Sequence, residues 1–304
     1  MKIRPRAAEA LLFLTAALWG FAFVAQRVGM EYLGPLTYNG VRFLLGSFSL
    51  LPLILFRRRL RSTRLGSVPH RGLLISRELV VACIIGGLIL TVAANLQQWS
   101  LQFITAGKAG FITGLYVVLV PIAGAALGRK TPLQAWIGCG VAVIGLYLLS
   151  VMGGFRIDRG DLIVLSSTVF WTAHILFLDF FAKRVDPVEL SAGQFFVCGF
   201  LTLTGAFLFE VPRWTAVVSA LVPILYGGLL SIGVAYTLQA VAQRTAHPVR
   251  ASLIMSLEAV FAALGGALIL GERLNLRELA GCALMLAGMM IAQAPSRSET
   301  NAPT

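Results

Sequence analysis

The chain has 304 residues, of which 58% are hydrophobic and 12% are charged, and its net charge at pH 7 is +12. That charged share is about half of what soluble proteins carry, so a water-soluble fold could not hide so much apolar surface. In a soluble protein the positive charge would indicate nucleic-acid binding, but these basic residues lie in short loops between apolar stretches, where they orient a protein in the bilayer. We therefore expect the lipid bilayer as a partner, and no nucleic acid.

Ten apolar stretches of about 20 residues follow one another along the chain, and each is long enough to cross a bilayer as a helix. The expected helices span residues 8–28, 35–56, 79–101, 106–127, 133–151, 161–182, 188–209, 214–240, 246–270 and 277–294. The loops on the side of the N-terminus hold 17 lysines and arginines and those on the other side hold six; seven of the 17 lie in one basic cytoplasmic loop, 57–78. The positive-inside rule therefore places both termini in the cytoplasm. The polar tail, 295–304, is expected to be disordered.

The motifs of the first half return in the second half. The residues paired by a shift of 152 are Trp19 with Trp171, Pro35 with Pro187 and Phe43 with Phe195. Each half holds five expected helices, an odd number, so the second half must enter the membrane from the opposite side. Inverted repeats of this kind enclose a central site that opens to either side. The expected fold is an all-α membrane protein of ten transmembrane helices in two inverted five-helix repeats, residues 8–151 and 161–294, around a central cavity.

Two rows of polar side chains lie in the third and the eighth expected helix. Polar groups in hydrocarbon are costly unless they face a partner or a wet cavity, so such rows trace a pathway. At helical spacing along one face of each helix, the rows contain Thr91, Asn95, Gln98 and Gln102, and Tyr236, Gln239 and Gln243. The rows indicate a lined cavity. The alternative is that the amides only link neighbouring helices by hydrogen bonds.

Trp19 and Trp171 lie deep in the first and sixth expected helices, away from the membrane interfaces where tryptophan is usual. A flat amphipathic ring beside a cavity suits small aromatic, apolar or cationic solutes, and the alternative is simple helix packing. His174 shares the face of Trp171 and is the only histidine expected at membrane depth. It is either a buried core residue or a proton relay.

Glu258, near the middle of the ninth expected helix, is the carboxylate with the highest cost in the membrane. A low dielectric favours the neutral form of a carboxyl group, which makes Glu258 a candidate proton carrier. The alternative is a permanent ion pair with Arg42 in the second expected helix. The sequence leaves both alternatives open.

Several short motifs are distributed over residues 8–294. They are Leu18-Trp19-Gly20-Phe21, Gly34-Pro35, Arg42-Phe43, Phe111-Ile112-Thr113-Gly114-Leu115-Tyr116 with Pro121, Leu257-Glu258, and Leu270-Gly271-Glu272-Arg273-Leu274. Together they resemble the EamA family of the drug/metabolite transporter superfamily. The resemblance implies a ten-span inverted-repeat carrier of the bacterial inner membrane, usually an exporter of amino acids, other metabolites or drugs. It also implies a cavity lined by helices one to four and six to nine, with the fifth and tenth at the periphery.

Two positions depart from the family pattern. The proline that commonly follows the ninth-helix glutamate is Ala259 here, so no proline kink is expected at that point. The loop glutamate corresponding to Glu272 is Arg129 in the first half, which argues against a symmetric role for that glutamate.

The expected function is secondary transport of a small metabolite, with export of amino acids or related or drug-like compounds favoured by the resemblance. The expected substrate-binding residues are Trp19, Asn95, Gln98, Tyr116, Trp171, His174, Tyr236 and Gln239; the candidates for proton coupling or charge pairing are Glu258, His174 and Arg42. A homodimer through the fifth and tenth helices is an open alternative to a monomer. No cofactor, metal or catalytic residue is expected, because the chain has no HExxH motif and no GxSG with a partner histidine. The other functions considered are an intramembrane enzyme acting on a lipid-linked substrate and a facilitative channel.

Overall fold

The computed structural model describes residues 4–65, 76–104, 106–150, 159–269 and 275–293, and these residues contain helices and no strand. The elements are α1 (Pro5–Gly29), α2 (Pro35–Leu65), α3 (Arg77–Ser100), α4 (Ala106–Gly114), α5 (Tyr116–Ala126), α6 (Leu133–Ser150), α7 (Arg159–Phe181), α8 (Pro187–Phe209), α9 (Trp214–Ser219), α10 (Leu221–Leu225), the π-helix η2 (Tyr226–Tyr236), α11 (Thr237–Ala242), α12 (Pro248–Met255), α13 (Glu258–Ile269) and α14 (Leu276–Gln293). The expected disordered tail lies outside the described residues, as do residues 66–75 of the basic loop.

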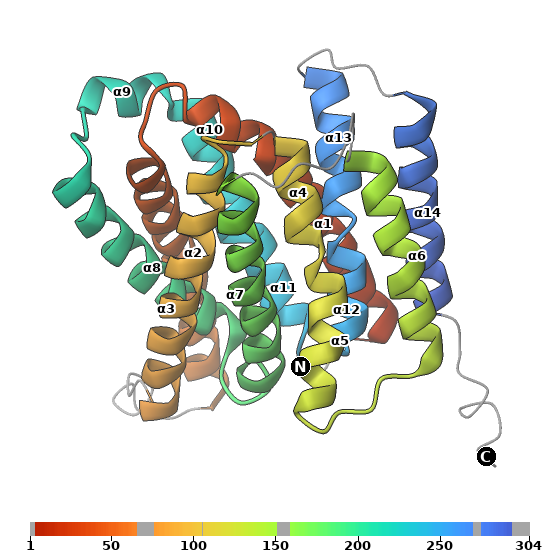
Figure 1. The fold of residues 1–304 in the computed structure, drawn as a ribbon. Helices are drawn as coiled ribbons and strands as arrows, with labels where there is room; N and C mark the ends of the chain where they lie inside the picture. The colour runs from red at the N-terminus through yellow and green to blue at the C-terminus, as the bar shows by residue number, and fades with distance from the viewer. Residues whose placement is uncertain (1–3, 66–75, 105, 151–158, 270–274, 294–304) are drawn as a thin grey trace.

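Within the described residues, seven helical segments are long and apolar enough to cross a membrane. They are Pro5–Gly29, Pro35–Leu60, Arg77–Ser100, Arg159–Phe181, Pro187–Phe209, Leu221–Ala242 and Pro248–Ile269, and the shorter apolar helices are Ile112–Ala126 and Leu133–Leu148. The helices stand side by side, and the two ends of the described chain lie at the same, lower end of the molecule (Figure 1). Large apolar side chains such as Phe48, Leu55 and Phe200 point outward and are more than half exposed, as lipid-facing residues are.

Helix starts follow from local capping chemistry. Pro35, Pro187 and Pro248 occupy the first helical position of α2, α8 and α12, where a missing N–H costs nothing. The side chain of Ser76 accepts a hydrogen bond from the Leu79 N–H at the start of α3 (3.1 Å). The cap of α8 is Asp186, whose carboxylate accepts from the Val188 N–H (3.0 Å).

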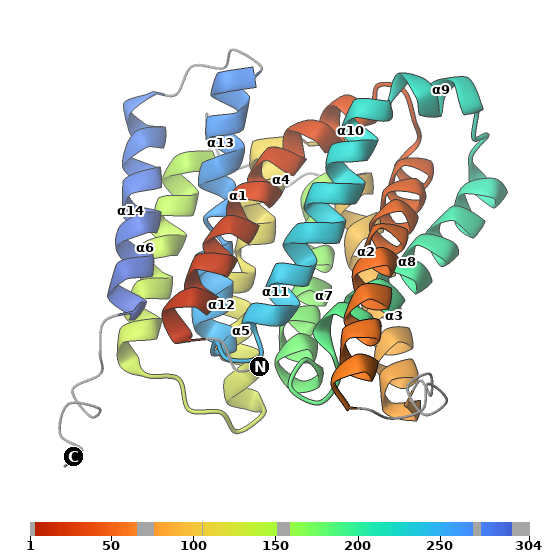
Figure 2. The same ribbon diagram turned by 180° about the vertical axis from the view of Figure 1, so that it is seen from behind.

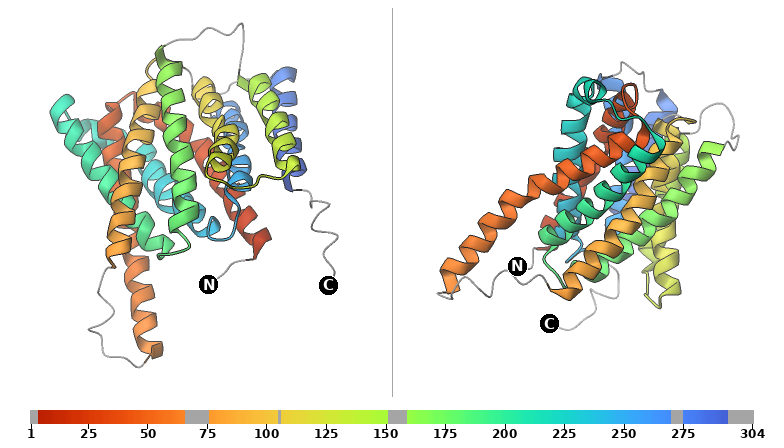
Figure 3. Two further views of the ribbon diagram at one scale, coloured as in Figure 1. Left: turned by 60° about the horizontal axis from the view of Figure 1, so that its bottom comes forward. Right: turned by 90° about the vertical axis from the view of Figure 1, so that its left-hand side faces the viewer.

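The helix α2 is longer than expected. It continues to Leu65, so residues 57–65, expected as part of a loop, are helical. Arginine and leucine dominate that segment and both favour helix, which explains the extension. Figure 3 shows this end of α2 projecting beyond the other helices.

Two expected helices are broken near their middles, and neither break was predicted. α4 and α5 meet at Leu115, where the Leu115 N–H bonds to Ile112 O (3.2 Å) and the Val118 N–H bonds to Leu115 O (3.0 Å). α12 and α13 meet at Ser256–Leu257, where the Leu257 N–H bonds to Ile254 O (3.2 Å). Bonds three residues apart tighten the chain locally and turn the helix. The second break forms without a proline at position 259, so the absence of a proline kink did not imply a continuous helix.

α6 and α14 pack against each other at one side of the molecule (Figures 1 and 2). A Cβ atom at Gly138 would lie 2.6 Å from the Gly288 carbonyl, and one at Gly288 would lie 2.6 Å from the Gly138 carbonyl. The glycines of these two helices therefore serve the close packing of α6 against α14 within one chain. A homodimer through α6 and α14 stays a prediction, and it would have to use their outer faces.

Candidate functional site

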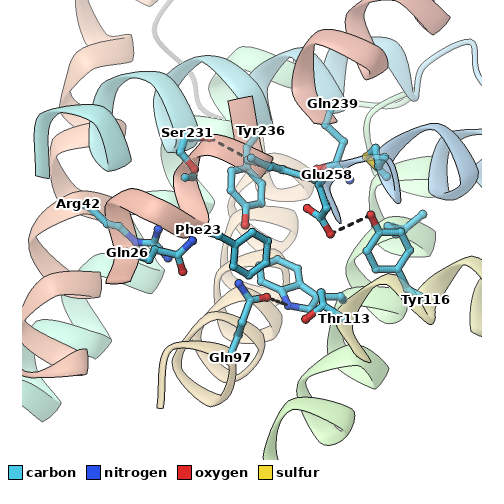
Figure 4. Close-up of a pocket in the computed structure, with 15 residues that line it drawn as sticks. Phe23, Gln26, Arg42, Gln97, Thr113, Tyr116, Ser231, Tyr236, Gln239 and Glu258 are labelled. Atoms are coloured by element: carbon cyan, nitrogen blue, oxygen red, sulfur yellow. Dashed lines mark hydrogen bonds between the residues drawn. The ribbon is translucent and has the colours of Figure 1, made fainter. Parts of the chain in front are cut away.

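A central cavity lies at the two helix breaks. It holds about 480 Å³ of empty space, including its opening to solvent. Its wall contains Trp19, Ala22, Phe23, Gln26, Arg42, Gln97, Thr113, Tyr116, Trp171, Ile175, Ser231, Tyr236, Gln239, Met255 and Glu258 (Figure 4). These residues come from both halves of the chain.

The structure brings most of the expected site residues together around this cavity. Those in the wall are Trp19, Tyr116, Trp171, Tyr236, Gln239, Glu258 and Arg42. Three others, Asn95, Gln98 and His174, lie outside it. Sequence reasoning did not select Phe23, Gln97, Thr113 and Ser231, which also line the cavity.

The glutamine of α3 that lines the cavity is Gln97, and not Gln98 as expected. Gln97 faces the cavity, and its side-chain oxygen accepts a hydrogen bond from Trp171 Nε1 (2.8 Å). Gln98 is fully buried, and neither of its amide atoms has a hydrogen-bond partner in the described residues. Since each residue turns a helix by about 100°, neighbouring glutamines cannot share a face. A buried tryptophan needing an acceptor was the signal that could have favoured Gln97.

Asn95 links helices instead of lining the cavity. Its Nδ2 donates to Thr202 Oγ1 on α8 (2.7 Å), and its Oδ1 accepts from Asn39 Nδ2 on α2 (2.9 Å). Here the hydrogen-bonding alternative describes the side chain better than the cavity alternative.

His174 is 1% exposed and lies behind the wall. Its Nε2 is 3.1 Å from Gln194 Oε1, and its ring stacks on Phe177 with centroids 6.0 Å apart. The structure therefore places His174 in the packed layer behind Trp171, and a proton-relay role stays a prediction.

Aromatic rings form one wall of the cavity. The rings of Trp19 and Tyr236 have centroids 4.5 Å apart, and those of Trp171 and Tyr236 have centroids 6.0 Å apart. Trp19 Nε1 donates to the carbonyl of Ser231 in the π-helix η2 (3.3 Å). Both indole N–H groups thus have acceptors, which fixes the two rings relative to each other. π-helical turns within α-helices are frequent at functional sites.

Glu258 and Tyr116 connect the two broken helices. Tyr116 is the first residue of α5, Glu258 is the first residue of α13, and the Tyr116 hydroxyl donates to Glu258 Oε1 (3.1 Å). The two residues are 142 positions apart, one in each half of the chain. A helix N-terminus stabilises the ionised carboxylate, whereas burial disfavours it. The hydrogen bond therefore holds the first residues of α5 and α13 together at the cavity.

Glu258 does not pair with Arg42. The Arg42 Nε donates to Asn39 Oδ1 (2.9 Å), and the guanidinium lies over the rings of Tyr38 (5.3 Å) and Phe43 (5.5 Å). Among the described residues no ion pair joins the two groups, and proton coupling through Glu258 stays a prediction.

Ion pairs lie below the cavity, at the same end of the molecule as the first and last described residues. Arg57 Nη2 is 3.0 Å from Asp186 Oδ2, and Arg58 Nε is 3.0 Å from Glu189 Oε1. Both pairs join α2 to the start of α8. Burial alone would raise the pKa of Asp186, but Arg57 and two backbone N–H donors outweigh burial, so this pKa lies below its ordinary value of 3.8.

Asp186→Asn is expected to lower the melting temperature at neutral pH. Asparagine keeps the helix cap, so the change isolates the ion pair with Arg57, which is worth about 0.5–1 kcal/mol because the arginine is partly exposed. A depressed native pKa means that the stabilisation is present above the unfolded-state pKa and is lost as the pH falls through the native value. Melting curves in detergent should therefore differ at pH 7 and converge once the pH is below the native pKa of Asp186. A constant difference at both pH values would contradict this origin.

Known proteins match the chain along most of its length. The sequence profile of the EamA-like transporter family matches residues 6–151 and, a second time, residues 158–293. A protein of Archaeoglobus fulgidus named an uncharacterized transporter is 27% identical over 92% of this chain and 83% of its own. The uncharacterized transporter YoaV of Bacillus subtilis is 25% identical over 90% of this chain and 92% of its own. The uncharacterized inner membrane transporter YedA of Escherichia coli (strain K12) is 26% identical over 60% of this chain and 55% of its own.

One solved structure, described as the crystal structure of a protein, has a similar fold. It superposes with a TM-score of 0.79 over 97% of this chain and 99% of that chain, with 20% sequence identity. At that identity the likeness concerns the fold alone.

Proposed function

This chain belongs to the EamA-like transporter family, and on that premise we propose that it exports small metabolites across a bacterial inner membrane by alternating access. Its relatives are named transporters, which favours transport over an enzymatic role. The observation that carries the proposal is the cavity at the two helix breaks, walled by both halves of the chain.

The two halves act as inverted repeats in this proposal. The family profile matches twice, and each match contains one of the two helix breaks, at Leu115 in the first and at Ser256–Leu257 in the second. In this proposal the described helices make ten membrane crossings when each broken helix counts as one crossing. The broken helices are α4–α5, α10–η2–α11 and α12–α13. Discontinuous helices at the midplane are typical sites of substrate binding in transporters with inverted repeats.

Glu258 couples transport to protons in this proposal. Its hydrogen bond from Tyr116 joins the two broken helices, so a change in its charge acts on both repeats at once. In this proposal the N- and C-termini lie in the cytoplasm. The arginine-rich end of α2 supports this orientation, because it lies at the same, lower end of the molecule as the two ends of the described chain (Figure 2).

Counterflow in proteoliposomes tests the proposal. Vesicles preloaded with an unlabelled amino acid or aromatic amine are diluted into the labelled compound, and transient accumulation is measured against protein-free vesicles. A carrier accumulates label because internal substrate speeds the return step, whereas a channel only equilibrates it. Ion currents through single molecules, or modification of a compound without movement, would contradict the proposal.

A further inference from the structure

Arg42 is a buried cation in the cavity wall that has only neutral partners among the described residues. Its side chain lies in α2 and is 3% exposed. The guanidinium bonds to the Asn39 amide and contacts the rings of Tyr38 and Phe43. A charge at membrane depth is costly unless a counter-charge or water compensates it.

The nearest carboxylate of the wall is engaged elsewhere. In Figure 4, Glu258 points to Tyr116 at one end of the cavity, whereas Arg42 lies at the other end beside Gln26, with Phe23 and Tyr236 between. Gln26 Oε1 is buried and has no hydrogen-bond partner in the described residues. One end of the cavity therefore presents a cation without a counter-charge and, beside it, an amide oxygen that can accept a hydrogen bond from a donor such as an ammonium group.

The fold itself does not require a cation at this position. The shift of 152 that pairs Phe43 with Phe195 places Gln194 opposite Arg42. Gln194 is fully buried, lies behind the wall and contacts His174. A neutral side chain therefore packs at the equivalent position of the second half. Packing alone does not explain why the residue at position 42 is charged.

We propose that Arg42 binds the carboxylate of the transported solute, with the Gln26 amide as its neighbour in the same binding end. A guanidinium offers parallel N–H donors that match a carboxylate and hold its direction. The body of the solute then lies over Phe23 and Tyr236, toward Glu258. This assignment rests on the proposed transport function and narrows its substrates to small carboxylic acids and zwitterions.

The test compares each acid with its own primary amide. The probes are L-leucine, L-phenylalanine, L-threonine and 3-phenylpropionate with their amides, and the readout is the melting temperature of the purified protein, which rises on binding. We expect at least one acid to stabilise the wild type. Its amide should need about a 10- to 100-fold higher concentration for the same shift, the range expected when a charged hydrogen bond is lost.

The variants isolate the guanidinium. Arg42→Gln should abolish the preference for the acid, Arg42→Lys should keep part of it, and Arg213→Gln, at an exposed arginine outside the cavity, should keep all of it. The assignment is overturned if no acid stabilises the wild type, if acid and amide act equally, or if Arg42→Gln keeps the preference. If Arg42→Gln does not fold, the wild-type comparison and Arg42→Lys decide.

The assignment and the transport function can fail separately. Counterflow of amides or amines with inert acids would overturn the role of Arg42 and leave transport intact. Acid binding that depends on Arg42 but produces no counterflow would overturn transport and leave the binding assignment intact.

Discussion

Glu258→Gln is expected to abolish accumulation driven by a pH gradient while exchange of substrate continues. Glutamine has nearly the same shape, and its carbonyl can still accept the Tyr116 hydroxyl, so the contact between α5 and α13 is kept. What is lost is the ability to bind and release a proton. With one proton per solute, a gradient of one pH unit can support about tenfold accumulation, and the variant should show none of it.

The measurement is uptake of label into proteoliposomes with and without an imposed pH gradient. Glu31→Gln is the matched control, because it makes the same exchange at an exposed carboxylate outside the cavity; it should respond to the gradient as the wild type does. Accumulation by Glu258→Gln equal to that of the wild type would show that this carboxyl group carries no proton.

Gly20→Ala is expected to damage both stability and transport. A Cβ atom at Gly20 would lie 2.3 Å from Phe261 Cβ and 2.7 Å from the Glu258 carbonyl oxygen, because α1 crosses α13 closely at this point (Figure 2). The helices must separate, and overpacking of this kind costs about 1–3 kcal/mol. Separation also displaces Trp19 and Glu258, which face the cavity on either side of the crossing.

Melting temperature and counterflow measure the two effects. Gly140→Ala is the matched control, since a Cβ atom at Gly140 in α6 would meet nothing within 4 Å. The control should behave as the wild type. A Gly20→Ala protein with unchanged melting temperature and counterflow would show that the crossing is looser than the structure indicates.

The sequence predicted the helical membrane class and the aromatic part of the site. Trp19 and Trp171 are conspicuous because they lie far from the interfaces where tryptophan is usual, and both line the cavity. Glu258 was equally conspicuous, since a carboxyl group at membrane depth is energetically costly and usually has a function. Such residues can be recognised in the sequence because the free-energy cost of placing them at membrane depth does not depend on how the helices pack.

The details that depend on helix rotation and local backbone geometry were not predictable. Gln97 and Gln98 are adjacent, and only the rotation of α3 decides which one faces the cavity. The breaks at Leu115 and Ser256–Leu257 contain no proline, and the π-helix η2 has the composition of an ordinary apolar helix. Those features arise from contacts between helices distant in sequence, which local propensity does not encode.

Access to the cavity from both faces of the membrane tests the account most directly. Ser231→Cys, in a protein whose four native cysteines are replaced by alanine, places one thiol in the cavity wall. Its labelling by a small membrane-impermeant thiol reagent is measured in right-side-out and in inside-out vesicles. Alternating access predicts labelling from both faces, with one rate rising and the other falling when the pH gradient is reversed. Labelling from one face only under every gradient would contradict it.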